Sequence, residues 1–148
     1  MIHSITAVLL IGIVIGVFDA LAATTLASFN GVPPSKVWQF VASGIRGPRA
    51  FEEGRKSSAL GLFLHFVIAL GVTSTFVIAA HFFPWLVASP FLTGAIFGLF
   101  VFFMMQLIMR LSATPKRTMK PNQVLGQLVI HIFVIGIPIA VLTKHSLL

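Results

Sequence analysis

Residues 59–80 form a run of 22 residues that carries no formal charge. About 20 helical residues at about 1.5 Å each cross a hydrocarbon core of roughly 30 Å, so this run predicts a membrane-spanning helix. One histidine, His65, lies well inside the run. Because an ionisable side chain is costly in lipid, His65 is a candidate functional residue whose partner must come from elsewhere in the chain.

Other apolar runs of similar length predict four membrane spans in total, at residues 5–27, 59–80, 91–109 and 123–142. Soluble domains carry about 25% charged residues. This chain of 148 residues carries 9%, and 57% of it is hydrophobic. We therefore expect one all-α transmembrane domain, residues 1–148, built as a bundle of four helices. The chain contains no cysteine, which excludes disulfides and thiolate metal sites.

A fifth helix is expected between the first two spans. After Pro33 and Pro34, residues 35–45 place apolar side chains at helical spacing with polar ones between them. This pattern predicts a short amphipathic helix in the membrane interface, with Trp38 at the level of the lipid headgroups. Trp85, in the short connection after the second span, is a second candidate interfacial residue. The polar stretch up to residue 58 is expected to be a solvated loop.

The basic residues predict the orientation of the chain. Nine of the ten lysines and arginines lie in residues 36–56 and 110–120. An even number of spans separates these segments, so both face one side, and the positive-inside rule makes that side the cytoplasm. Both termini are then periplasmic. Because membrane topology accounts for the net charge of +7, we expect the lipid bilayer, and no nucleic acid, as a partner.

Polar side chains from all four spans fall near one depth, just cytoplasmic of the midplane: Asp19, His65, Gln106 and His131. Met104 and Met105 lie in the same band. Rows of small residues on the first two spans suggest that Asp19 and His65 face inward, and we expect these two side chains to contact each other.

Small residues let membrane helices approach closely. The candidate packing positions are Gly12, Gly16, Gly61, Gly94 and Gly98. These faces exceed what one thin bundle needs, so we expect a homo-oligomer or docking into a larger membrane complex. In the last span, Gly136 and Pro138 are expected to bend the helix.

Three explanations remain open for the polar layer. Asp19 and His65 can form a hydrogen-bonded pair that only fixes helix register. A carboxylate and imidazoles can instead pass protons or bind a substrate within the membrane. Finally, His65 and His131 can ligate haem b, or can join Asp19 in a transition-metal site.

Enzyme signatures are absent: the chain has no glycine-rich phosphate loop, HExxH or GxSxG. We therefore expect no catalytic residues and no enzyme activity. The leading interpretation is a non-enzymatic accessory, assembly or structural subunit of an inner-membrane complex, with no cofactor. The alternatives are a small proton-coupled transporter or channel that uses the polar layer, and a haem- or metal-binding membrane protein.

Several short motifs recur in a familiar order. They are GVPP at residues 31–34, VWQFVASG at 37–44, Ala50-Phe51, Gly54, Gly61 followed by His65, and late His131 with Gly136-Ile-Pro138. In this order the chain resembles small bacterial four-helix inner-membrane proteins and is distantly similar to the YagU-like type. The resemblance implies a four-helix protein of the bacterial inner (plasma) membrane. It implies no activity, ligand or catalytic residue.

Overall fold

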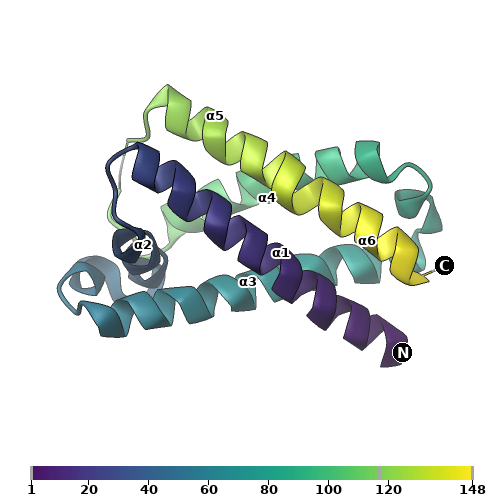
Figure 1. Ribbon diagram of the computed structural model, residues 1–148, viewed down its shortest axis with the longest axis horizontal. Coiled ribbons are helices and arrows are strands. Elements are labelled where there is room, and N and C mark those ends of the chain that lie inside the picture. The colour runs from purple at the N-terminus through teal and green to yellow at the C-terminus, as the bar shows by residue number, and fades with distance from the viewer. Residues whose placement is uncertain (1, 117, 148) are drawn as a thin grey trace.

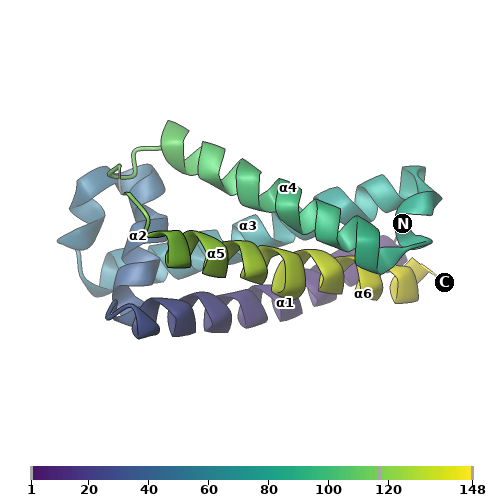
Figure 2. The ribbon, with the colours of Figure 1, turned by 90° about the horizontal axis from the view of Figure 1, so that it is seen from above.

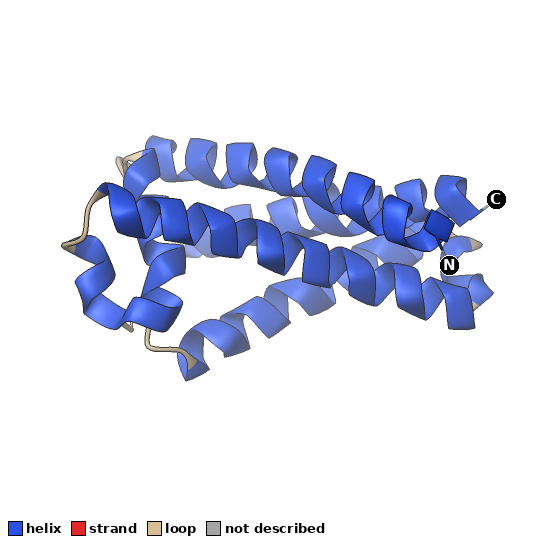
Figure 3. Cartoon of the chain, turned by 90° about the horizontal axis from the view of Figure 1, so that it is seen from below, coloured by secondary structure: helices blue, strands red, loops and turns tan. Residues whose placement is uncertain are grey.

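The structure, a computed structural model, describes residues 2–116 and 118–147, and all regular secondary structure in them is helical (Figure 3). The helices are α1 (Ile2–Phe29), α2 (Pro34–Arg46), α3 (Arg55–Phe82) and α4 (Pro90–Leu111), followed by a continuous helix made of α5 (Pro121–Ile130), the π-helical segment η3 (His131–Gly136) and α6 (Ile137–Leu147). Short 3-10 segments, η1 (Gly47–Phe51) and η2 (Pro84–Val87), lie in two of the connections.

Four of these helices are long and apolar enough to cross a membrane, namely α1, α3, α4 and the helix from α5 to α6. The protein is therefore a multi-pass integral membrane protein, as predicted. Each helix extends a few residues beyond its predicted span. The spans were predicted from apolar runs, which indicate the part of a helix inside the hydrocarbon core, whereas the helix itself can continue into polar residues. At the start of α3, for example, Arg55 and Lys56 are helical although both are charged.

The two chain ends lie at one end of the bundle, and α2 lies at the other (Figures 1 and 2). Helix α1 packs against α3, while α4 packs against η3 and α6. Contacts between α1 and α6 join the two pairs. The consecutive helices α3 and α4 make few direct contacts with each other.

Glycines on α1 face α3. A Cβ atom added to Gly12 would lie 2.7 Å from the side chain of Leu70, and one added to Gly16 would lie 2.9 Å from the ring of Phe66. Such distances are shorter than the van der Waals contacts of carbon atoms, about 3.5–4.0 Å, so a larger residue at either position would force the side chain of Leu70 or Phe66 to shift. The close packing of α1 on α3 therefore depends on these two positions.

Glycines on α4 face the last helix in the same way. A Cβ atom on Gly94 would lie 2.6 Å from the Cα of Ile137, and one on Gly98 would lie 2.7 Å from the Cα of Ile132. These positions, like the glycines of α1, are thus used inside one chain. The expectation that these glycines are left free for self-association is wrong, because they already pack against other helices of the same chain. Self-association stays a prediction without that support.

The last helix is π-helical from His131 to Gly136, where a bend was predicted. At the end of this segment the N–H of Ile137 donates to the carbonyl of Ile132, five residues earlier. Pro138 follows directly and has no N–H to donate, so the regular α-helical pattern fails at this point. The widened turn accommodates that missing donor.

Helix α2 and η1 form a folded cap where a loop was expected beyond residue 45. Ala42 and Ala50 are completely buried in this cap. An added Cβ on Gly61 would overlap the backbone of Trp38, so α2 sits directly on α3. The N–H of Ala113 donates to the carbonyl of Gly44 at 3.2 Å, which ties the connection after α4 to α2.

The apolar core occupies the half of the bundle near the chain ends. It contains Ala7, Ile11, Ile15, Phe76, Ala80, Ile135, Ile139 and Ala140. These residues come from α1, α3, η3 and α6, and Phe97 of α4 packs against them, so all four long helices meet there. The opposite half, beneath α2, holds the polar residues of the candidate site.

Candidate functional site

Asp19 on α1 and His65 on α3 lie side by side in the polar half of the bundle. The Oδ2 atom of Asp19 is 3.9 Å from Nδ1 of His65, and their side chains are 20% and 11% exposed. The expected contact between these residues is therefore present. It depends on Gly16, because the close packing of α1 on α3 at that glycine brings the imidazole to the backbone of α1.

The tautomer of His65 follows from its second contact. Its Nε2 atom is 2.9 Å from the carbonyl oxygen of Gly16. A carbonyl can only accept, so Nε2 is assigned a proton, which it donates to Gly16. Nδ1 then faces the carboxylate of Asp19. The 3.9 Å between Nδ1 and Oδ2 is an ion-pair separation, longer than a hydrogen bond.

Aromatic rings surround His65. The ring of Trp38 lies 5.3 Å from it in an edge-to-face arrangement, and Phe66 lies at 5.4 Å with similar geometry. Sequence reasoning missed the Trp38 contact. The amphipathic pattern of α2 shows which side of the helix is apolar, but it does not show which residue that side contacts. The placement of Trp38 at the headgroup level stays a prediction, as does that of Trp85, which is exposed.

His131 belongs to the same layer. Its Nδ1 is 2.7 Å from the carbonyl of Gln127, one turn earlier, so Nδ1 is assigned the proton and Nε2 keeps a lone pair. The ring packs edge-to-face on Phe102 at 5.6 Å. Asp19 lies within electrostatic range of both His131 and His65. The structure thus gathers one acid and two imidazoles from three helices.

Other predicted members of the layer lie elsewhere. Gln106 is half-buried on α4 but is not a hydrogen-bond partner of Asp19 or of either histidine. Met104 and Met105 line an apolar groove of about 290 Å³ between α3 and α4. These methionines therefore share the predicted depth of the layer without belonging to it.

The histidines do not fit the haem expectation. Nε2 of His65 is engaged by Gly16, and its Nδ1 faces Asp19. Trp38 covers the ring on the α2 side, where a porphyrin would have to displace it. Among the described residues, no group of three or more His, Asp or Glu side chains is arranged to hold a metal ion. The arrangement suits proton binding better than metal binding.

Comparison with known proteins finds no matching family model, no matching curated protein and no matching solved structure. The resemblance to small bacterial inner-membrane proteins stays a prediction.

Proposed function

We propose that the chain is a non-enzymatic membrane protein of the bacterial inner membrane, an accessory or structural subunit, in which Asp19 and His65 form a clasp that holds one proton. The carrying observation is the 3.9 Å separation of Oδ2 and Nδ1, with Nε2 bound to Gly16. The clasp joins α1 to α3 where glycine brings them together. Polar contacts between membrane helices contribute about 0.6–2 kcal/mol each.

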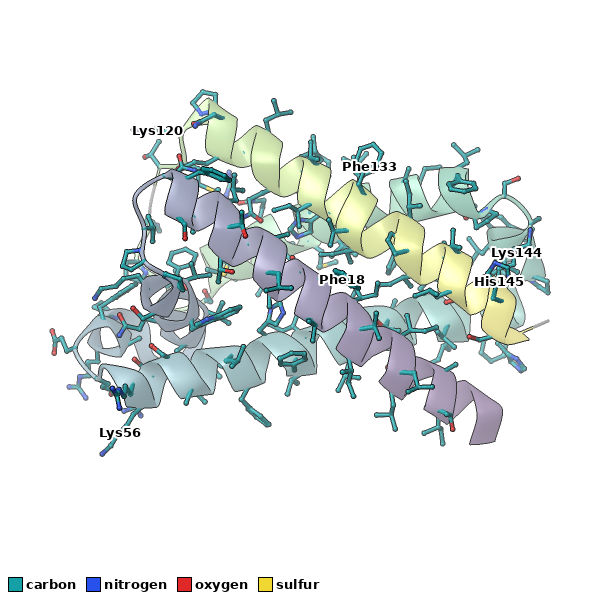
Figure 4. The ribbon with its side chains drawn as sticks, in the orientation of Figure 1. Phe18, Lys56, Lys120, Phe133, Lys144 and His145 are labelled. Atoms are coloured by element: carbon teal, nitrogen blue, oxygen red, sulfur yellow. The ribbon has the colours of Figure 1, made fainter. Side chains whose placement is uncertain are left out.

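The orientation proposed for the protein rests on its charge. Lys56 and Lys120 lie at the α2 end of the bundle, whereas Lys144 and His145 lie at the end with the termini (Figure 4). The α2 end also carries most of the basic residues. By the positive-inside rule, that end faces the cytoplasm, and α2 lies near the cytoplasmic membrane interface.

Two substitutions at Asp19 test the clasp. Asp19→Asn keeps a polar side chain of the same size beside Nδ1 of His65 while it removes the acidic group. Asp19→Ala removes both. In detergent, we expect the free energy of unfolding of Asp19→Asn to be close to that of the wild type. The free energy of unfolding of Asp19→Ala should be lower by about 0.6–2 kcal/mol. Equal stability of Asp19→Ala and wild type would rule out the clasp.

A second function, proton-coupled transport or conduction, is favoured by one observation. The carboxylate of Asp19 interacts electrostatically with two histidines on different helices, His65 and His131. His131 also retains a free lone pair on Nε2 that can accept a proton. This reading predicts that Asp19→Asn, although folded, abolishes a pH-gradient-driven flux in liposomes. The accessory reading predicts no flux in either protein and a membrane partner that copurifies in mild detergent.

A further inference from the structure

An open apolar groove of about 440 Å³ lies between α1 and the last helix. These two helices run side by side in Figures 1 and 2, and α5 and η3 both contact α1. Apolar and small side chains at helical spacing form most of its walls. They are Phe18, Ala22, Thr25 and Phe29 of α1, together with Ile130 and Val134 of the last helix.

Two small residues make this surface hollow. A Cβ atom added to Gly126 of α5 would lie 2.8 Å from Cδ2 of Leu26, so the side chain of Leu26 lies against the bare backbone of α5. Ala22, one turn earlier on α1, contributes only a methyl group. Phe18 and Phe29, toward the two ends of the groove, are 57% and 86% exposed. The groove is therefore part of the apolar surface that a spanning helix turns toward lipid.

The length of the groove matches one leaflet of a bilayer. From Phe18 to Phe29, the last residue of α1, the helix rises about 16 Å, and one leaflet contributes about 15 Å of hydrocarbon. Spread over that length, the volume of the groove leaves a cross-section of roughly 27 Å². A helix of 10–12 Å diameter has a cross-section of about 80–110 Å². The groove thus fits a single acyl chain better than a partner helix.

A basic residue lies where the groove reaches the α2 end of the bundle. Nδ2 of Asn122 donates to Oδ1 of Asn30 at 3.4 Å, which joins the start of α5 to the residue after Phe29. Lys120, two residues before Asn122, is exposed at this end (Figure 4). Neither ion pair among the described residues involves Lys120. An ammonium group at the depth of the headgroups attracts anionic lipid phosphates.

We propose that the groove binds one anionic phospholipid, with an acyl chain between α1 and the last helix and its phosphate at Lys120. The second amide N–H of Asn122 can donate to the same headgroup. With the basic end of the bundle in the cytoplasm, this lipid belongs to the cytoplasmic leaflet. The site lies outside the Asp19–His65 pair, so it goes beyond the proposed function and stands or falls separately from it.

The test is native mass spectrometry of the full chain in mild detergent. Phosphatidylglycerol and phosphatidylcholine with the same acyl chains are titrated separately, so that only the headgroup differs. We expect the first phosphatidylglycerol to bind about fivefold more tightly, the factor for one basic residue near an anionic headgroup. Glycerol 3-phosphate, which has the charge but no acyl chain, should not displace it. Equal affinities, displacement by glycerol 3-phosphate, or a dimer that excludes the lipid would each overturn the site.

Two pairs of variants locate the lipid. Lys120→Gln should abolish the fivefold preference, whereas Lys56→Gln, which removes the same charge at the start of α3 (Figure 4), should retain it. Equal losses would overturn the site, because net charge alone would then attract the lipid. Ala22→Leu fills the groove and should abolish the tight binding. Ala59→Leu places the same side chain at an exposed position of α3 and should not.

The headgroup comparison stands on its own, since Lys120 is exposed and precedes α5, so Lys120→Gln does not disturb the packing. If folded Ala22→Leu binds phosphatidylglycerol as tightly as Ala59→Leu, the groove is not the site.

Discussion

Replacing Gly98 by alanine tests the packing of α4 on the last helix. The added methyl carbon would lie 2.7 Å from the Cα of Ile132, whereas carbon contacts prefer about 3.5–4.0 Å, so the helices must separate by roughly 1 Å. Overpacking costs about 1–3 kcal/mol, and the upper end applies because backbone atoms cannot rotate away. Alanine in a helix regains about 1 kcal/mol over glycine, which leaves a net loss of about 2 kcal/mol.

Gly71→Ala is the matched control. No heavy atom lies within 4 Å of a Cβ added at this position on α3, so the helix-propensity term acts alone and we expect a gain of about 0.5–1 kcal/mol. The two variants therefore shift stability in opposite directions. The free energy of unfolding is measured by denaturant titration in detergent, followed by circular dichroism. If Gly98→Ala proves as stable as Gly71→Ala, the close helix approach described here is wrong.

Two further predictions concern the cap at the α2 end. Ser57→Ala leaves the buried carbonyl of Ala50 without its donor, which costs about 1–3 kcal/mol and should speed tryptic cleavage in residues 46–56, unlike Ser58→Ala. The hydrogen bond and charge of Arg46 lower the pKa of Glu53, so this pair contributes stability above the ordinary glutamate pKa and loses it as the pH falls through the lowered value. Glu53→Gln should abolish that acid-dependent part of the stability, measured by denaturant titration at pH values down through the lowered pKa, and an unchanged pH profile would contradict it.

The four long helices could be predicted because uncharged apolar runs of about 20 residues are typical of membrane-spanning helices and of few other structures. The contact between Asp19 and His65 was also accessible, since small residues flank both on adjacent spans. The sequence did not reveal which helix each glycine faces. Gly61 was predicted only to be a packing position, and it packs against Trp38 of α2; residue spacing along one helix carries no information on its neighbour.

Two further features depend on tertiary contacts that local patterns do not encode. Residues 47–51 form η1 because Ala50 is buried and its carbonyl binds Ser57. Their glycine, proline and arginine content suggested only a loop. Pro138 did signal an irregular helix, and the absence of its N–H could have placed the irregularity just before it. The π segment packs closely against Gly94 and Gly98 of α4, and the pattern of the last span does not encode that contact.

The π segment also fixes how the fourth span tolerates changes in length. A π-helical turn accommodates one residue more than an α-helical turn, and each residue corresponds to about 100° of rotation. Deleting one residue within His131–Gly136 would let the helix revert to regular α geometry with its hydropathy almost intact. Because the deletion removes the extra residue of the π turn, Gln127 and the rest of α5 would keep their facing relative to α6, whereas the same deletion in a regular α-helical part would turn them by about 100°. A single-codon deletion here would therefore preserve both the membrane span and the alignment of its two halves.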